Sequence, residues 1–283
     1  MLLRTLWICL FTSLISISSS WAENWPAWRG ADRTDVSTET GLLREWPADG
    51  PALAWLSEKC GVGYAGFAVV DDNVYTMGAY KNDERLVCLD SATGEVRWRT
   101  VMTESVLENG WGDGPRGTPT VDGEFVYAMA GNGTLVCAKT ANGELVWKIS
   151  MQDLGGKVPN WGYSESVLVD GDQLICTPGG ADGALVAVNK LTGKKIWQSK
   201  EFNDQADYSS VIVAEHDGVR QYIQLTQKTL VGIAADDGRV LWSYPWPGRI
   251  AVVPTPIFRD GKVYVACGYG VGCGLVNLVD GTA

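Results

Sequence analysis

The chain has 283 residues and a formal net charge of −10, from 23 lysines and arginines against 33 aspartates and glutamates. This acidic balance argues against nucleic acid or an anionic membrane surface as the main partner. The single histidine, His216, leaves no natural set of members for a histidine-based zinc site or a Ser-His-Asp triad.

Residues 1–22 predict a secretory signal peptide. Arg4 precedes a short apolar core from Leu6 to Ile17, and Ser20-Trp21-Ala22 fits a small-x-small cleavage site. The apolar run is too short for a comfortable transmembrane helix, so an uncut membrane anchor is the less favoured alternative, and no other segment could span a bilayer. We therefore expect a periplasmic or secreted protein, with an N-terminal extension at residues 23–50 and a folded domain at residues 51–283.

A motif that ends in Gly-x-x-x-Trp returns four times in this domain. Its tryptophans are spaced by 49, 50 and 45 residues, and periods of this size indicate stacked supersecondary units. The motif glycines and tryptophans, which we expect to be structural, are Gly94 and Trp98, Gly143 and Trp147, Gly193 and Trp197, and Gly238 and Trp242.

The residues upstream of each tryptophan predict four antiparallel strands. Hairpin turns such as Asp122-Gly123 and Asp217-Gly218 separate short strand-like runs, and no segment after Glu23 has a convincing helical period. A single four-stranded sheet cannot bury both faces, so the copies must stack face to face. The sequence therefore predicts an all-β fold, a β-propeller in which each tryptophan docks between blades.

The first copy, from Cys88 to Trp98, resembles the Ala-x-Asp-x-x-Thr-Gly-x-x-x-Trp pattern of the PQQ-like β-propeller repeat superfamily, with Cys88 at the alanine position. The other copies depart from it more, with Lys139 and Asn189 at the aspartate position of the second and third. The superfamily includes quinoprotein alcohol dehydrogenases and the outer-membrane assembly lipoprotein of the barrel-assembly machinery. The resemblance covers about residues 50–283, and Trp25-Pro-Ala-Trp-Arg-Gly30 resembles the start of secreted bacterial members. It is specific for the fold and weak for activity.

The fifth copy is incomplete. Gly281 stands at its motif glycine, and the chain ends at Ala283 before the next tryptophan would come. The resemblance implies seven or eight blades, so we expect a truncated propeller with about five blades, the last incomplete; closure with five blades is the alternative. Residues 51–55 are expected to form a lone fourth strand, of the kind that completes the last blade of closed propellers.

Loops of the same phase in different repeats should converge on one face, around a central funnel. They are rich in aromatic and charged residues, and a concave, aromatic-lined mouth is the default site hypothesis. The alternative is that the aromatics pack between blades and the charges pair structurally. The loops contain Trp111 to Arg116, Asn160 to Glu165, Asp204, Asp207-Tyr208 and Pro245 to Arg249.

For a quinoprotein, the resemblance implies pyrroloquinoline quinone (PQQ) and calcium in this funnel. Candidate bases are Asp113 and Asp207. The candidate PQQ ligands are Arg116, Trp161, Tyr163, Tyr208 and Arg249, and the weaker candidate calcium ligands are Asn160, Glu165 and Asp207. Many alcohol-oxidising members carry a pair of adjacent cysteines, which this chain lacks.

The cysteines suggest two roles. Cys88, Cys137 and Cys176 fit small buried core residues. Cys267 and Cys273 flank a glycine-rich hairpin, so a disulfide between them is a candidate in an oxidising compartment.

Two functions follow from these observations. The first is an exported, non-catalytic binding or scaffold module that holds a protein, peptide or glycan at its funnel. The alternative is a PQQ-dependent alcohol or sugar dehydrogenase.

Overall fold

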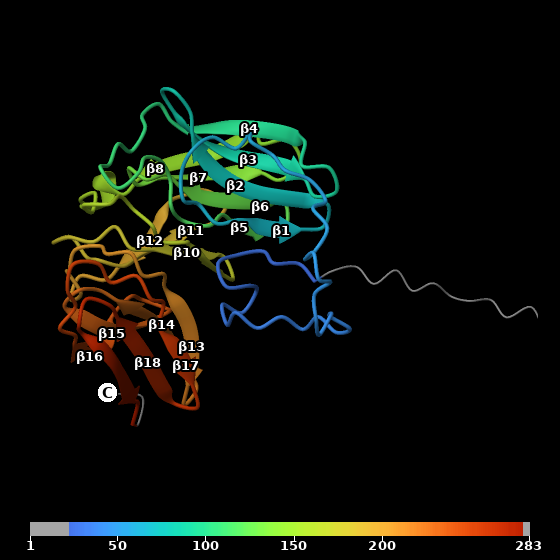
Figure 1. Ribbon diagram of the computed structural model, residues 1–283. Coiled ribbons are helices and arrows are strands. Elements are labelled where there is room, and N and C mark those ends of the chain that lie inside the picture. The colour runs from blue at the N-terminus through green and yellow to red at the C-terminus, as the bar shows by residue number, and fades with distance from the viewer. Residues whose placement is uncertain (1–22, 280–283) are drawn as a thin grey trace, which may run out of the picture.

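The computed structural model describes residues 23–279, which form five antiparallel sheets in chain order (Figure 1). Blades 1 to 4 have four strands each, and three strands of blade 5 lie within the described residues. This confirms the predicted all-β propeller architecture with about five blades. The predicted signal peptide and Gly281 lie outside the described residues.

Blade 1 consists of β1 Ala68–Val70, β2 Asn73–Ala79, β3 Glu84–Asp90 and β4 Val96–Thr103, and blade 2 of β5 Thr120–Asp122, β6 Phe125–Met129, β7 Thr134–Lys139 and β8 Leu145–Ser150. Blade 3 consists of β9 Leu168–Asp170, β10 Gln173–Cys176, β11 Val186–Asn189 and β12 Lys195–Gln198, and blade 4 of β13 Ile212–His216, β14 Val219–Leu225, β15 Thr229–Ala234 and β16 Val240–Pro245. Blade 5 contains β17 Ile257–Arg259, β18 Lys262–Cys267 and β19 Gly272–Asn277.

Helical structure within residues 23–279 is a single 3-10 turn, η1, at Gln152–Leu154. No helix in this range combines the length and apolarity needed to cross a bilayer. In Figure 1 the blades follow one another from blade 1 at the top to blade 5 at the bottom, and the blue N-terminal segment lies on the side of strands β1, β5, β13 and β17.

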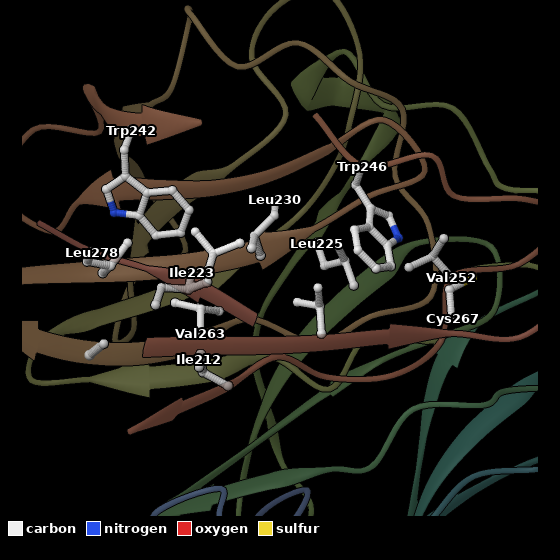
Figure 2. Packing of buried hydrophobic residues seen from close by; sticks show 13 residues of the cluster. Ile212, Ile223, Leu225, Leu230, Trp242, Trp246, Val252, Val263, Cys267 and Leu278 are labelled. Carbon is white, nitrogen blue, oxygen red and sulfur yellow. The ribbon is translucent and has the colours of Figure 1, made fainter. Parts of the chain in front are cut away.

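The hydrophobic core consists of four clusters, one between each pair of successive blades. Between blades 4 and 5, Trp242 and Trp246 lie at the two ends of a row of aliphatic side chains that includes Ile223 and Val263 (Figure 2). Because each sheet buries its faces only against its neighbours, the stability of each blade depends on the blades beside it.

Each motif tryptophan of the first three copies packs on the motif glycine of the next blade. An ideal Cβ atom at Gly143 would lie 2.5 Å from Cε3 of Trp98, and one at Gly238 would lie 2.4 Å from Cε3 of Trp197. Both glycines also have positive φ, 73° and 78°, so any larger residue would be excluded by the ring and by the backbone. The indole Nε1 atoms of Trp98, Trp147 and Trp197 donate to the carbonyl groups of Thr140, Lys190 and Ala235 at 3.0, 2.9 and 3.3 Å.

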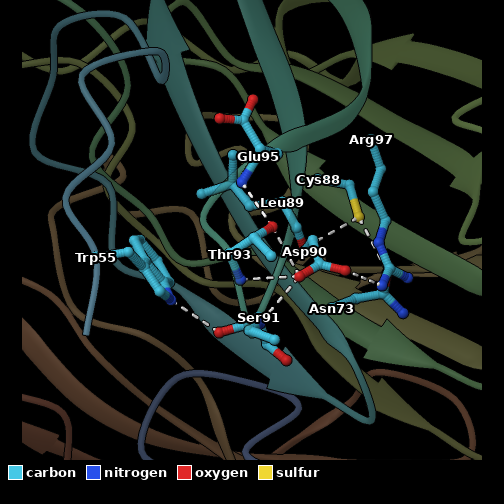
Figure 3. Close-up of polar contacts among 10 residues, drawn as sticks. Trp55, Asn73, Cys88, Leu89, Asp90, Ser91, Thr93, Glu95 and Arg97 are labelled. Atoms are coloured by element: carbon cyan, nitrogen blue, oxygen red, sulfur yellow. Dashed lines mark hydrogen bonds and ion pairs between the residues drawn. The ribbon is translucent and has the colours of Figure 1, made fainter.

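Trp55 takes the same place against blade 1, although its segment differs from the expected lone strand. Its Nε1 donates to the Ser91 carbonyl at 2.9 Å, and its ring lies against Gly94 (Figure 3). Residues 51–57 have no assigned strand, because a strand requires a hydrogen-bonded partner and no described segment pairs with them. Trp242 donates instead to Oε1 of Gln221, at 2.6 Å.

The turn before each motif glycine explains which sequence departures are tolerated. Asp90 Oδ1 accepts bonds from the Thr93 backbone N–H and hydroxyl, both at 2.9 Å (Figure 3). In the third copy Asn189 Oδ1 accepts the same pair of bonds from Thr192, at 3.0 Å each. An amide oxygen therefore replaces the carboxylate in the third copy. In the second copy Lys139 has no such oxygen, and the backbone bond from the Gly143 N–H to the Lys139 carbonyl at 2.9 Å closes the turn.

Five of the six cysteines within residues 23–279 lie in the core or at a hairpin, and the sixth, Cys60, is half-buried. Cys88, Cys137 and Cys176 lie in inter-blade clusters, as expected of small apolar residues. The candidate disulfide between Cys267 and Cys273 is not formed, and both thiols are free. Since β18 and β19 pair Cys273 with Ala266, the two cysteines occupy alternate positions, with Cys267 buried and Cys273 exposed on the other face.

Candidate functional site

Loops from four blade junctions and the β18–β19 hairpin meet around a cavity of 540 Å³, here called the aromatic cavity. Three of the five candidate PQQ ligands, Arg116, Trp161 and Tyr208, line it together. The expected convergence of same-phase loops therefore holds for these residues. The full lining is Trp111, Arg116, Trp161, Ser164, Tyr208, Ile250, Ala251, Val253 and Tyr269.

The polar groups of this cavity are engaged by its own loops. The Arg116 guanidinium donates through Nε to the Trp161 carbonyl at 2.6 Å and through Nη2 to the Gly112 carbonyl at 2.5 Å. It also lies 5.0 Å above the Tyr64 ring centroid. The main observed contacts of Arg116 are therefore with the loops of the protein itself, which it holds together. The exposed aromatic side chains of the lining are Trp111 and Tyr269. Behind them the rings of Trp161 and Tyr208 lie 5.6 Å apart between centroids.

A second, polar cavity of 270 Å³ adjoins the first and shares Tyr208 and Ile250 with it. It has two carboxylates, both hydrogen-bonded: Asp204 Oδ2 accepts from the Thr226 hydroxyl at 2.6 Å, and Asp207 Oδ1 from the Val252 N–H at 3.2 Å. Burial raises the pKa of Asp207 to about 6. Its other lining residues are Lys157, Val158, Pro159, Asn160, Gln205, Ala206, Gln227 and Lys228.

The remaining candidates lie elsewhere. Tyr163 is buried in the cluster between blades 2 and 3, where its hydroxyl donates to the Pro178 carbonyl at 2.9 Å. Arg249 is exposed and lines neither cavity. Asp113 accepts the Asn109 N–H at 2.8 Å in an exposed loop. The sequence placed all three in the right loops but could not indicate the direction of each side chain.

The candidate calcium ligands are not assembled into one site. Asn160 and Asp207 line the polar cavity. Glu165 is buried, and its two carboxylate oxygens accept the Thr177 N–H at 2.7 Å and the Thr177 hydroxyl at 2.9 Å. Within residues 23–279, no three His, Cys, Asp or Glu side chains are grouped as a metal site would require.

Sequence reasoning missed the role of residues 25–33, here called the axial segment. Trp25 pairs with Val69 of blade 1, and the Pro26 carbonyl accepts the Val121 N–H of blade 2 at 2.8 Å. The axial segment also contacts residues just before the first strand of each of the other three blades. Its remaining contacts are Arg33 Nη2 to the Val167 carbonyl, Arg33 Nη1 to the Val211 carbonyl at 2.9 Å, and Trp28 Nε1 to Thr255 Oγ1 at 3.1 Å.

Arg33 and Glu165 bring opposite charges into the interior of the protein. Arg33 is only 6% exposed, and burial lowers its pKa to about 10, opposed by the charge of Glu165. Burial raises the pKa of Glu165 to about 7, opposed by the Thr177 bonds and by Arg33. A buried arginine cannot be recognised from a short charged and glycine-containing segment, because its partners are backbone carbonyls far away in the sequence.

The raised pKa of Glu165 predicts a loss of stability with rising pH. A carboxyl group with a native pKa of about 7 and an unfolded value near 4.5 stabilises the fold fully below pH 4.5 and loses that contribution as pH rises through 7. The loss amounts to roughly 3 kcal/mol. We expect Glu165→Gln to remove this part of the pH dependence in urea denaturation at pH 4.5 to 8.5, whereas the exposed Glu124→Gln leaves it unchanged. Parallel profiles for wild type and Glu165→Gln would contradict the assignment.

Stacked four-stranded blades, tryptophans docked on the motif glycines of the next blade, and a mouth formed by inter-blade loops define the class. The chain is a PQQ-like β-propeller repeat protein. A family model described as outer membrane protein assembly factor BamB matches residues 32–127 and 82–280, and the chain belongs to that family. The two overlapping matches reflect the internal repeat.

Individual relatives agree with this placement. The outer membrane protein assembly factor BamB of Yersinia pestis is 25% identical in an alignment of 259 residues that covers 85% of this chain. The chain spans only 60% of that relative's length. The BamB structure from Moraxella catarrhalis has a TM-score of 0.51 at 18% identity, covering 79% of this chain and 62% of that one. Quinohemoprotein alcohol dehydrogenase from Comamonas testosteroni has a TM-score of 0.50 at 18% identity, covering 64% and 35%. These structural similarities show the fold alone.

Proposed function

We propose that this chain is an exported, non-catalytic binding module of the cell envelope that helps to assemble outer-membrane proteins. Its membership in the BamB family supports the role in assembly. In this proposal the aromatic cavity at the funnel mouth holds another protein. A cluster of exposed large apolar side chains on a rigid propeller face is typical of a protein interaction site.

The observation that carries the proposal is the engagement of the charged groups around the mouth. Arg116 donates to two backbone carbonyls, and Asp113 and Asp207 each accept a backbone N–H. What faces outward is Trp111, which is 78% exposed, beside the Trp161 and Tyr208 rings. An aromatic cavity whose arginine is already bonded to its own loops suits the burial of a partner side chain better than acid–base chemistry.

The donor set argues against the dehydrogenase alternative. PQQ carries several carboxylates, which would require free cationic donors at the cavity. Arg116 is the cationic side chain that lines the aromatic cavity, and its Nε and Nη2 donors are already bonded to the protein backbone. The aromatic cavity therefore offers the several carboxylates of PQQ a single arginine that is already partly engaged, which is a poor fit.

Trp111→Ala is expected to weaken the complex with the partner about 30-fold in Kd. This corresponds to about 2 kcal/mol, the usual loss when a central aromatic anchor is truncated. A photo-crosslinking residue placed at position 111 in cells should identify the partner as an envelope protein, and calorimetry with that purified partner gives the affinity. Complementation of a deletion strain should restore folded outer-membrane proteins with wild type and not with Trp111→Ala.

Leu191 provides the matched control, because it is 48% exposed on the motif turn before Gly193, away from both cavities. Crosslinker at position 191 and Leu191→Ala should have no effect. Equal crosslinking from both positions would overturn the assignment of the binding face. Dye reduction by the purified protein with alcohols, PQQ and calcium would instead support the dehydrogenase.

A further inference from the structure

The aromatic cavity and the polar cavity adjoin, because Tyr208 and Ile250 line both. Their chemistry differs sharply. The aromatic cavity presents Trp111, Tyr269 and Val253, which are 78%, 57% and 57% exposed. A ligand that covers both cavities must therefore combine a large apolar group with a polar one.

The charges of the polar cavity indicate the sign of that polar group. Asp204 and Asp207 are both hydrogen-bonded by the protein. Lys157 and Lys228 also line the cavity, and the ammonium group of neither has a hydrogen-bond or ion-pair partner among residues 23–279. Both lysines are exposed and unpaired, whereas Asp204 is half-buried, Asp207 is buried, and each already accepts a hydrogen bond. The charged groups most available to a ligand are therefore cationic.

We propose that the funnel mouth recognises an extended acidic peptide segment of its partner, with an aromatic side chain in the aromatic cavity and a neighbouring carboxylate on Lys157 and Lys228. This rests on the proposed function, that the mouth binds another protein. An aromatic anchor supplies most of the binding energy, and the exposed charge pair adds selectivity for acidic segments. The strong salt dependence of exposed charge pairs provides a signature of the second contact.

Fluorescence anisotropy with a labelled synthetic peptide tests the proposal. The peptide carries one phenylalanine and two neighbouring aspartates between Gly-Ser spacers, and matched peptides replace the aspartates by asparagine or the phenylalanine by alanine. We expect the aspartate peptide to bind about tenfold more tightly than the asparagine peptide at low salt, with the difference shrinking as salt is added. The Lys157→Gln/Lys228→Gln protein should lose this difference and retain its affinity for the asparagine peptide.

The matched control is Lys194→Gln/Lys195→Gln, which removes the same charge from exposed lysines near the Gly193 turn. It should bind all peptides as wild type does. Equal affinity of the aspartate and asparagine peptides for wild type, or no binding up to about 1 mM, the weak end of the usual range, overturns the inference.

The outcomes separate this inference from the proposed function. If the peptide selectivity fails while crosslinking from position 111 still identifies a protein partner, the mouth binds its partner without acidic selectivity. Loss of both the crosslink and the peptide binding removes the proposed function itself. Tighter binding of a neutral oligosaccharide than of any peptide would assign the mouth to a glycan.

Discussion

Trp197→Ala is expected to lower the free energy of unfolding by about 3–5 kcal/mol, the usual range for a buried tryptophan. Trp197 is 8% exposed, packs on Gly238 of blade 4 and stacks on the Tyr222 ring at 6.1 Å between centroids. Its removal opens a cavity between blades 3 and 4 and leaves the Ala235 carbonyl without its indole donor. Urea denaturation followed by far-ultraviolet circular dichroism gives the change.

Trp46→Ala is the matched control, because Trp46 is 68% exposed and its loss should change stability by no more than about 0.5 kcal/mol. A loss below about 1 kcal/mol for Trp197→Ala would show that the inter-blade tryptophan is not a principal stacking contact. Gly238→Ala should destabilise the same junction from the other side, since an added methyl group would enter the space of the Trp197 ring.

Arg33→Ala is expected to lower the free energy of unfolding by about 3–5 kcal/mol, because it removes one of two buried opposite charges and leaves the other uncompensated. Arg33 donates to the carbonyl groups of Val167 and Val211, and its charge offsets that of buried Glu165. The variant removes the Arg33 bonds to both carbonyls, of which Val167 keeps the bond from the Thr120 hydroxyl at 2.6 Å, and it leaves the Glu165 carboxyl group without its counter-charge. Since Arg33 holds down the pKa of Glu165, the cost should be larger at pH 8 than at pH 5.

Arg44→Ala is the matched control, because it removes an arginine that is exposed in the same N-terminal region. It tests whether the loss of stability requires the burial of Arg33. It should leave the unfolding curve within about 0.5 kcal/mol of wild type. A cost for Arg33→Ala that does not change with pH would leave the bonds to the two carbonyls as its only contribution. A wild-type unfolding curve for Arg33→Ala would contradict the view that the axial segment ties the blades together.

The repeat determined most of the fold. The Gly-x-x-x-Trp spacing and the Asp-Gly turns are local signals, and a hairpin or a docking turn needs only its own few residues to form. Asp90 and Asn189 show this, because each orders its turn by bonding to a threonine three residues later. The loops that build the mouth could be located for the same reason, since loops of equal phase in a repeat must emerge on the same side.

What the sequence by itself determined about this protein is therefore its blade architecture, its docking tryptophans and the side of the ring on which its loops meet. The tertiary structure alone decided that Tyr163 faces the core while Tyr208 faces the mouth, that Cys267 and Cys273 occupy opposite faces of a hairpin, and that Arg33 lies buried beside Glu165. The physical reason is the distance along the chain over which each kind of interaction acts. Periodicity and turn chemistry act between neighbours in the chain, whereas the direction of a loop side chain and the partners of a buried charge depend on residues more than a hundred positions away.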